Sequence, residues 1–189
     1  MTKQAVAMQE PVVRNGVNVT ALFDTIDAMK GNQELAQFQF RTQNRWMGGD
    51  HNCSTIEGFH GACQEMMHAQ VFEMDNGEPA VLLGADRHPN PVEYVLHALI
   101  GCLTTTMVYH AAARGITIES IESRLEGDLD LRGFLGLSDK VRKGFHTVRV
   151  QMRVKSSASA PLLRDLAKFS PVYDIVSNSL PVEVSVETC

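Results

Sequence analysis

Residues 88–115 read HPNPVEYVLHALIGCLTTTMVYHAAARG, and this stretch decides the fold. Apolar side chains fill most of the positions between its two ends. Pro91 suits the first turn of a helix, where its missing N–H costs nothing, and Gly115 suits the position just after a helix ends. The spacing therefore predicts a helix over residues 91–114. Because this helix is apolar nearly all round, we expect it to be central and buried, with Cys102 near its middle.

A second, shorter helix is predicted well before the first. Over residues 19–30 apolar side chains recur every three or four positions, which is the pattern of one helix face. Asn18 can cap the start of this helix and Gly31 can end it. With about three turns, the helix is expected to lie against a sheet or a partner subunit.

Between the two helices the apolar period changes to two, which is typical of strands. Within residues 35–83, a hairpin turn is expected at residues 46–50 and strands at residues 51–60 and 64–74. Asp-Asn-Gly at residues 75–77 is a strong turn signal. This segment predicts a meander of three or four antiparallel strands.

Strands also follow the central helix. Residues 116–131 alternate between apolar and polar side chains and predict one long strand, whereas residues 132–144 contain three glycines and predict a loop. Residues 148–154 show the alternation of a half-buried strand. The remaining elements expected are an amphipathic helix over residues 159–169, a helical turn from Pro171, and a last strand carrying Val182, Val184 and Val186.

This order of elements predicts an α+β fold, with antiparallel sheets packed around a central buried helix. We expect residues 35–189 to form a single domain, preceded by an arm and short helix over residues 1–34. The length of 189 residues is enough for one domain with a sizeable core.

Composition excludes several classes of function. The net charge is −5, and no run of Lys or Arg offers a nucleic acid a basic face. No uninterrupted apolar run is long enough to span a bilayer, and the first residues lack the apolar core of a signal peptide. We therefore expect a cytoplasmic protein that binds neither nucleic acid nor membrane. Its four scattered cysteines, without a Cys-x-x-Cys pair, do not indicate a disulfide framework.

Cys102 is either inert core filling or a protected redox centre, and the residues alone leave both open. Helical spacing places apolar and hydroxyl side chains around it, from Val95 to Tyr109. The helix dipole fades within the first turn and cannot stabilise a thiolate three turns in. An arginine is the better candidate, and of Arg41 and Arg45 we favour Arg45. Glu93 lies nine residues before Cys102, on the opposite side of the helix, and is expected to pair with His97.

Other chemistries find less support. A stretch rich in nitrogen and sulfur ligands matches no known metal spacing, so no metal site is predicted, although a zinc module built on residues 51–68 stays a third hypothesis. No Gly-x-Ser-x-Gly elbow or phosphate loop is present, and no cofactor is expected. The ligand-type residues of that stretch are His51, Cys53, His60, Cys63 and His68.

Four short motifs form a pattern. They are Asn-Pro-Val-Glu-Tyr at 90–94, Ala-Leu-Ile-Gly-Cys-Leu at 98–103, Gly-Ile at 115–116 and Ser-Pro-Val-Tyr at 170–173. With these motifs the chain resembles the OsmC/Ohr family of thiol-dependent hydroperoxide reductases, from about residue 35 to 187. The resemblance implies an intertwined α+β homodimer with two sites at the interface. It also implies that Cys102 attacks an organic hydroperoxide and becomes a sulfenic acid.

Two positions depart from the family pattern. The family's second cysteine precedes a Pro-Val pair, where this chain has Ser170, and the family's carboxylate follows the proline directly, where this chain has Val92. The chain thus resembles a subgroup that lacks the second catalytic cysteine. Cys102, Arg45 and Glu93 are the catalytic candidates. An external thiol, or another cysteine such as Cys189, would have to resolve the sulfenic acid.

Two functions are therefore predicted besides the zinc module. The first is a peroxidase of the oxidative stress response with Cys102 as its redox-active cysteine. The second is a catalytically inactive relative that binds an apolar small molecule at the dimer interface, which the residues at positions 92 and 170 favour.

Overall fold

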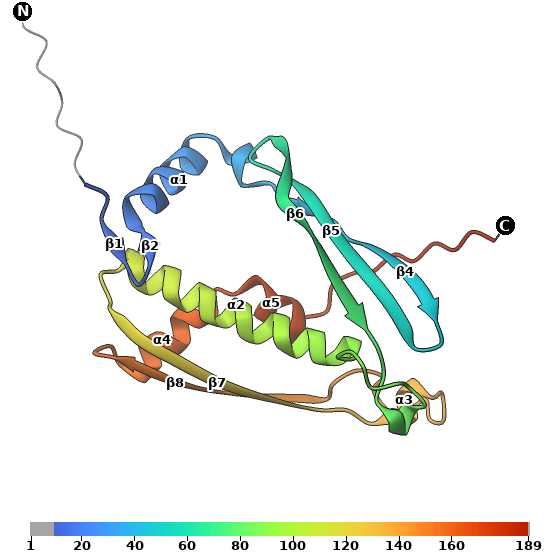
Figure 1. Cartoon of the computed structure of the whole chain (residues 1–189). Helices are drawn as coiled ribbons and strands as arrows, with labels where there is room; N and C mark the ends of the chain where they lie inside the picture. Colours follow the sequence, from blue (N-terminus) through green and yellow to red (C-terminus); the bar gives the residue numbers. More distant parts are fainter. Residues whose placement is uncertain (1–9, 189) are drawn as a thin grey trace, which may run out of the picture. The chain divides into compact units, whose positions relative to one another are not determined.

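The computed structural model describes residues 10–188, and the chain divides into two compact units, residues 1–94 and 95–189. The first unit contains a small hairpin, a helix and a four-stranded sheet (Figure 1). Its elements are β1 Val13–Arg14, β2 Val17–Asn18, α1 Val19–Gly31, η1 Gln33–Ala36, β3 Gln39–Phe40, β4 Gln43–Gly48, β5 His51–Gly61, β6 Gln64–Asn76 and η2 Ala80–Leu82.

Helix α1 forms where the apolar spacing predicts it. The Asn18 side chain accepts a hydrogen bond from the N–H of Ala21 at 3.0 Å, which satisfies one of the donors left unpaired at a helix start. At the other end the N–H of Asn32 returns to the carbonyl of Ala28. Both predicted boundaries of this helix are confirmed.

The four-stranded sheet is built around β5. Strands β3 and β4 follow one another along one edge of β5 and β6 pairs with its other edge, all antiparallel. The predicted meander is confirmed. The turn expected at residues 75–77 starts later, because Cys53 pairs with Asp75 and Asn52 with Asn76, which carries the ladder through β6 to its last residue.

Helix α2, Pro91–Ala113, begins in the last residues of the first unit and continues into the second. It ends as predicted at Gly115, whose φ of 77° is a left-handed conformation that glycine adopts without strain. The N–H of Ile116 bonds to the carbonyl of Ala111 at 2.9 Å, and that of Gly115 to Ala112 at 3.1 Å. This pair of bonds is a Schellman motif, which satisfies the last carbonyls of the helix.

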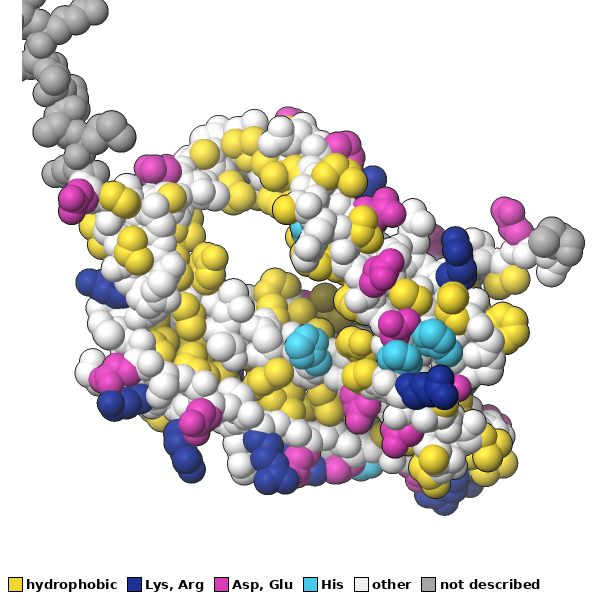
Figure 2. Space-filling view, in the orientation of Figure 1, with side chains coloured by type: hydrophobic (Ala, Val, Ile, Leu, Met, Phe, Trp, Pro, Cys, Tyr) yellow, Lys and Arg dark blue, Asp and Glu magenta, His cyan; other side chains and the backbone are white. Residues whose placement is uncertain are grey.

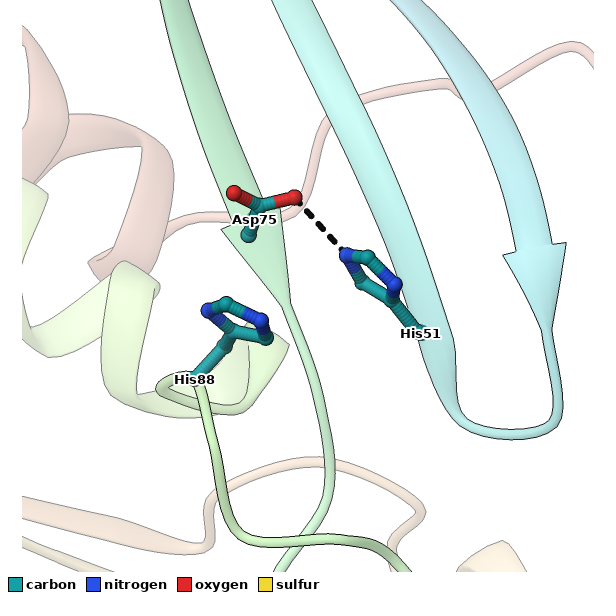
Figure 3. Close-up of side chains that lie close together, drawn as sticks. All are labelled: His51, Asp75 and His88. Atoms are coloured by element: carbon teal, nitrogen blue, oxygen red, sulfur yellow. Dashed lines mark hydrogen bonds and ion pairs between the residues drawn. The ribbon is translucent and has the colours of Figure 1, made fainter.

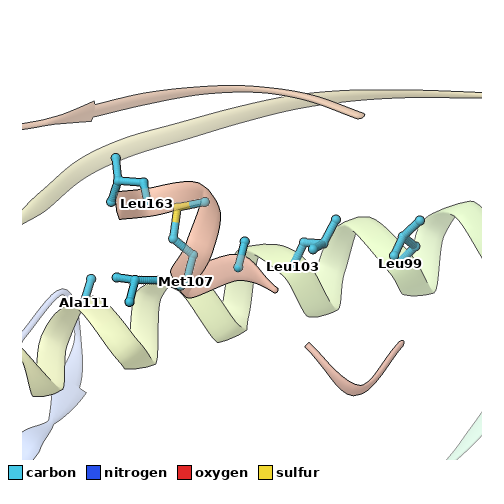
Figure 4. Packing of buried hydrophobic residues seen from close by; sticks show 7 residues of the cluster. Leu99, Leu103, Met107, Ala111 and Leu163 are labelled. Carbon is cyan, nitrogen blue, oxygen red and sulfur yellow. The ribbon is translucent and has the colours of Figure 1, made fainter. Parts of the chain in front are cut away.

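The prediction that α2 packs into the core is confirmed along one stripe of the helix, whereas other positions are exposed in the single chain. Gly101 and Tyr109, on other faces, are exposed. In the second unit one stripe of α2 is covered by the antiparallel strands β7, Ile118–Asp128, and β8, Thr147–Ser156, and by helix α4, Ala160–Ala167. Figure 4 shows this packing from close by. The buried cluster consists of Leu99, Leu103, Met107, Ala111, Leu163, Leu166 and Ala167.

By length and composition alone, α2 is also apolar enough to cross a membrane. The expectation that no segment could span a bilayer rested on uninterrupted apolar runs alone. Helix α2 reaches the required mean hydropathy although threonine, glycine and histidine residues interrupt its apolar residues. Its stripe from Leu99 to Ala111 packs into the protein core. A single helix of this kind is weak evidence for a membrane span, because the core helix of a soluble protein passes the same test.

Strands β7, Ile118–Asp128, and β8, Thr147–Ser156, form an antiparallel hairpin. The predicted strand over residues 116–131 is too long, because Asp130 caps a short helix, α3 Leu131–Phe134, by accepting the N–H of Arg132 at 3.0 Å. The predicted loop therefore begins with a helical turn. Figure 2 shows acidic and basic side chains along this hairpin, where cross-strand pairs such as Lys155 with Glu119 form.

Helix α4, Ala160–Ala167, and helix α5, Pro171–Ser177, follow as predicted. The last predicted strand is absent from the described residues: Val182, Val184 and Val186 are about four-fifths exposed, at 77%, 82% and 82%. A strand without a neighbour has no ladder to hold it. The α+β class with antiparallel sheets is confirmed, whereas the predicted boundary between an arm and a single domain at residue 35 stays a prediction.

Candidate functional site

Cys102 lies on α2 between the buried Leu99 and Leu103 and is itself half-buried. Residue 102 stands at the edge of the buried stripe of α2 rather than within it. Its Sγ lies 4.0 Å from Oγ1 of Thr106, one helical turn further on. A half-buried thiol beside a hydroxyl is open to a small reactant, while part of its surroundings excludes water.

A cavity of about 580 Å³ lies in the second unit beside the same helix. Leu103 and Met107 of α2 line it together with side chains of β8 and α4, and Arg164 and Tyr173 add polar groups. Figure 4 shows how Leu103, Met107 and Leu163 face the space between these elements. The cavity is mostly apolar and is large enough for a small organic molecule.

The two arginine candidates differ in their partners. Arg41, between β3 and β4, forms an ion pair with Glu65, a carboxylate on β6. Arg45, on β4 opposite Cys53, is exposed and forms no ion pair among the residues that the structure describes. Arg45 therefore keeps its guanidinium available, although it belongs to the first unit and Cys102 to the second.

Glu93 has a role that the analysis of the sequence missed. Its Oε2 accepts the N–H of Asn90 at 2.9 Å, while the Asn90 side chain accepts the N–H of Glu93 at 2.9 Å. This reciprocal pair is a capping box, and the Asn-x-x-Glu spacing was its signal. The predicted contact of Glu93 with His97 is wrong, because the capping bond turns the carboxylate toward the start of the helix.

Ser170, at the position of the family's second cysteine, is almost completely buried, at 1% exposure. Its Oγ accepts the N–H of Tyr173 at 3.1 Å and so caps α5. Its own N–H bonds to the carbonyl of Ala167. The hydroxyl is thus part of the helix start, and serine cannot form a disulfide with Cys102.

A cluster of three side chains in the first unit was not predicted (Figure 3). Nε2 of His51 lies 2.8 Å from Oδ1 of Asp75, and the rings of His51 and His88 stack with their centroids 4.9 Å apart. The hydrogen bond from His51 is the main cause that lowers the pKa of Asp75. Partial burial is the main cause that raises the pKa of the Cys53 thiol, and the Asp75 carboxylate raises it further. No sequence motif indicates this cluster, because its side chains come from three separate segments.

The ligand-type residues expected at 51–68 do not converge. His60 pairs with Glu65 through Nδ1 at 3.0 Å, and His68 packs edge-on against Phe72. Cys63 is exposed in the turn between β5 and β6. The residues of the zinc module that was kept as a third hypothesis do not meet as a set in the described part of the chain, and only His51 of its histidines belongs to the cluster of three.

The comparisons with known proteins decide the family. The model of the OsmC-like protein family matches residues 84–185, more than half of the chain, including α2 and Cys102. The chain belongs to the OsmC family. No curated protein sequence matches this OsmC-family chain.

Solved structures resemble the OsmC-family chain at low sequence identity. An OsmC-like protein from Mycoplasma pneumoniae is 12% identical with a TM-score of 0.54, over 75% of this chain and 89% of that one. An OsmC-like protein of unknown function from Vibrio cholerae is 14% identical with a TM-score of 0.53, over 77% and 95% of the two chains. Both likenesses concern the fold, and they agree with the α+β arrangement described above.

Proposed function

We propose that this OsmC-family chain reduces organic hydroperoxides in the cytoplasm, with Cys102 as the nucleophile. The observation that carries the proposal is the position of Cys102: it lies within the family-matched segment, on α2, half-buried and beside the Thr106 hydroxyl. A thiol packed wholly inside the core would be inert. A thiol at the edge of the buried stripe is accessible to a small peroxide.

The oxidation step needs only the thiol and the peroxide, and a thiol reductant completes the cycle. The Cys102 thiolate attacks the distal oxygen of ROOH, the O–O bond breaks, and the alkoxide takes a proton and leaves as ROH. The cysteine becomes a sulfenic acid. A thiol reductant R′SH then displaces water and forms a mixed disulfide, and a second R′SH releases Cys102 as a thiol together with R′SSR′.

Arg45 is the residue proposed to stabilise the thiolate, because an arginine stays charged when it is partly desolvated. Arg45 forms no ion pair among the described residues, whereas Arg41 pairs with Glu65. This difference supports Arg45 over Arg41 for the role. Glu93 is assigned a positioning role instead of a catalytic one, because its carboxylate fixes the start of α2. The proposal includes a homodimer, as the family resemblance implies.

Turnover of cumene hydroperoxide in the presence of dithiothreitol tests the proposal. Wild-type protein is expected to consume the peroxide, and Cys102→Ser to lose this activity. Cys63→Ser, an exposed cysteine in a turn, is the matched control and should keep the wild-type rate. Wild-type turnover that survives in Cys102→Ser would exclude Cys102 as the nucleophile.

The second candidate function is binding of an apolar small molecule, which the cavity of about 580 Å³ favours. Here Cys102 would have no chemical role. Native mass spectrometry of the purified chain would show a bound organic molecule, and Met152→Trp, which fills the cavity, would abolish it. Absence of any retained molecule, together with peroxide turnover through Cys102, would remove this candidate.

A further inference from the structure

Three side chains with metal-ligand chemistry meet at one end of the sheet in the first unit. His51 comes from β5, Asp75 from β6 and His88 from the segment before α2 (Figure 3). One ligand atom of each lies within 4.8 Å of the others, and all three residues are half-buried. Among residues 10–188 no other group of three histidine, cysteine or carboxylate side chains converges in this way.

The spacing of these atoms is close to what a metal ion requires. Two nitrogen or oxygen ligands at ordinary zinc distances in a tetrahedral site stand about 3.3 Å apart. The His51–Asp75 contact is 2.8 Å, and the widest separation in the cluster is under 4.8 Å. Small side-chain rotations therefore bring all three atoms onto one ion. The ion would replace the proton that His51 and Asp75 now share.

The backbone around the cluster is anchored, which limits the cost of ordering the ligands. The segment that carries His88 is tied to the end of β6 by a hydrogen bond from the Gly77 N–H to the Pro89 carbonyl at 3.2 Å. Asp50, next to His51, accepts the N–H of Glu78 at 2.9 Å. These hydrogen bonds hold the backbone next to His51 and His88 in place.

The ligand types select the class of metal. Two imidazoles and one carboxylate suit zinc and similar transition metals, whereas magnesium and calcium prefer oxygen ligands alone. We propose that His51, Asp75 and His88 bind one zinc ion, with solvent water in the fourth position. The side chains of His51 and Asp75 are 37% and 41% exposed, which leaves that position open to water. This site is separate from the proposed chemistry of Cys102.

Zinc titration of the tag-free full chain, with a competing chromogenic chelator and a phosphine reductant, tests the site. Wild-type protein is expected to bind one zinc ion per chain. His88→Ala keeps the His51–Asp75 bond but removes a ligand, and its affinity should fall by at least roughly 100-fold. Circular dichroism confirms that the variant is folded, and His51→Ala provides a second ligand deletion.

His60→Ala is the matched control. It removes a histidine that also pairs with a carboxylate on the same hairpin, Glu65, but that has no second histidine beside it. Zinc affinity and the zinc-induced rise in Tm should stay at wild-type values in this variant. Equal loss in His60→Ala and His88→Ala, or wild-type protein that binds no more zinc than His88→Ala, would overturn the proposal.

Discussion

At the scale of single residues, the neighbours of Cys102 on α2 determine how far its side chain is buried. Leu99 and Leu103 are buried on either side of it in the sequence, and Cys102 is turned far enough from their stripe to be half-buried. The helical period predicts which side chains surround it. The period does not predict how far the covering layer extends, because that depends on which elements pack on α2.

Thr106 is expected to assist the thiolate of Cys102. Its hydroxyl, 4.0 Å from Sγ, can donate a hydrogen bond to the charged form, and such bonds contribute at least about 1.5 kcal/mol, or roughly ten-fold in rate. Thr106→Val should slow oxidation of Cys102 by about this factor in stopped-flow measurements. Thr105→Val, the exposed neighbour, is the control and should leave the rate unchanged. Equal rates for wild type and Thr106→Val would contradict this role.

His110 should make stability depend on pH. Its ring stacks on Phe169 and accepts a hydrogen bond from Arg114 at Nδ1, and burial, with a smaller contribution from Arg114, lowers its pKa below 6.5. The neutral form is favoured in the folded state, so this stabilisation is present above pH 6.5 and is lost as the pH falls through the lowered pKa.

Urea unfolding at about pH 8 and about pH 5 tests this dependence. Wild-type protein is expected to lose more stability between the two values than His110→Phe, which keeps an aromatic ring against Phe169 but cannot take up a proton. The same loss in both proteins would show that other groups cause it.

At the scale of elements, the helix ends are the best predicted features. Asn18, Gly115 and Ser159 cap or end their helices because short polar side chains and glycine have few other ways to satisfy helix ends. The last predicted strand fails for the opposite reason: alternation shows that a segment suits a sheet, but not that a neighbouring strand exists. The cluster of His51, Asp75 and His88 depends on strand register, which the sequence does not state.

The capping box at the start of α2 should contribute measurably to stability. Glu93→Ala removes the bond from the Asn90 N–H and is expected to cost about 0.5–1 kcal/mol in urea unfolding. Glu93→Gln can still accept this bond and should stay close to wild type. If Gln and Ala destabilise equally, the charge of Glu93 matters more than its hydrogen bond.

At the scale of the whole molecule, the family and the α+β class follow from the chain's order of elements and from the segment around α2. The way in which two chains assemble does not follow from these features. Exposed apolar side chains on the last residues, such as Val184 at 82%, have no cover within the described chain. We expect this segment to become a strand when the proposed homodimer forms.

Val184→Lys tests this expectation. Placing a charge where a valine should be buried would weaken the dimer by roughly ten-fold or more, from about 1.5 kcal/mol of lost burial. Glu183→Lys, the adjacent residue that would face the other side of a strand, is the control and should associate like wild type. Sedimentation equilibrium measures both, and unchanged association of Val184→Lys would place the segment outside the interface.

The account as a whole depends on the reactivity of Cys102. The most direct test is rapid mixing of the reduced protein with cumene hydroperoxide and with hydrogen peroxide, with sulfenic acid trapped and assigned to each cysteine by mass spectrometry. The account predicts fast oxidation of Cys102 alone, and faster by the organic peroxide. Slow oxidation, or oxidation spread equally over Cys53, Cys63 and Cys102, would contradict it and would leave Cys102 as a packing residue beside an apolar cavity.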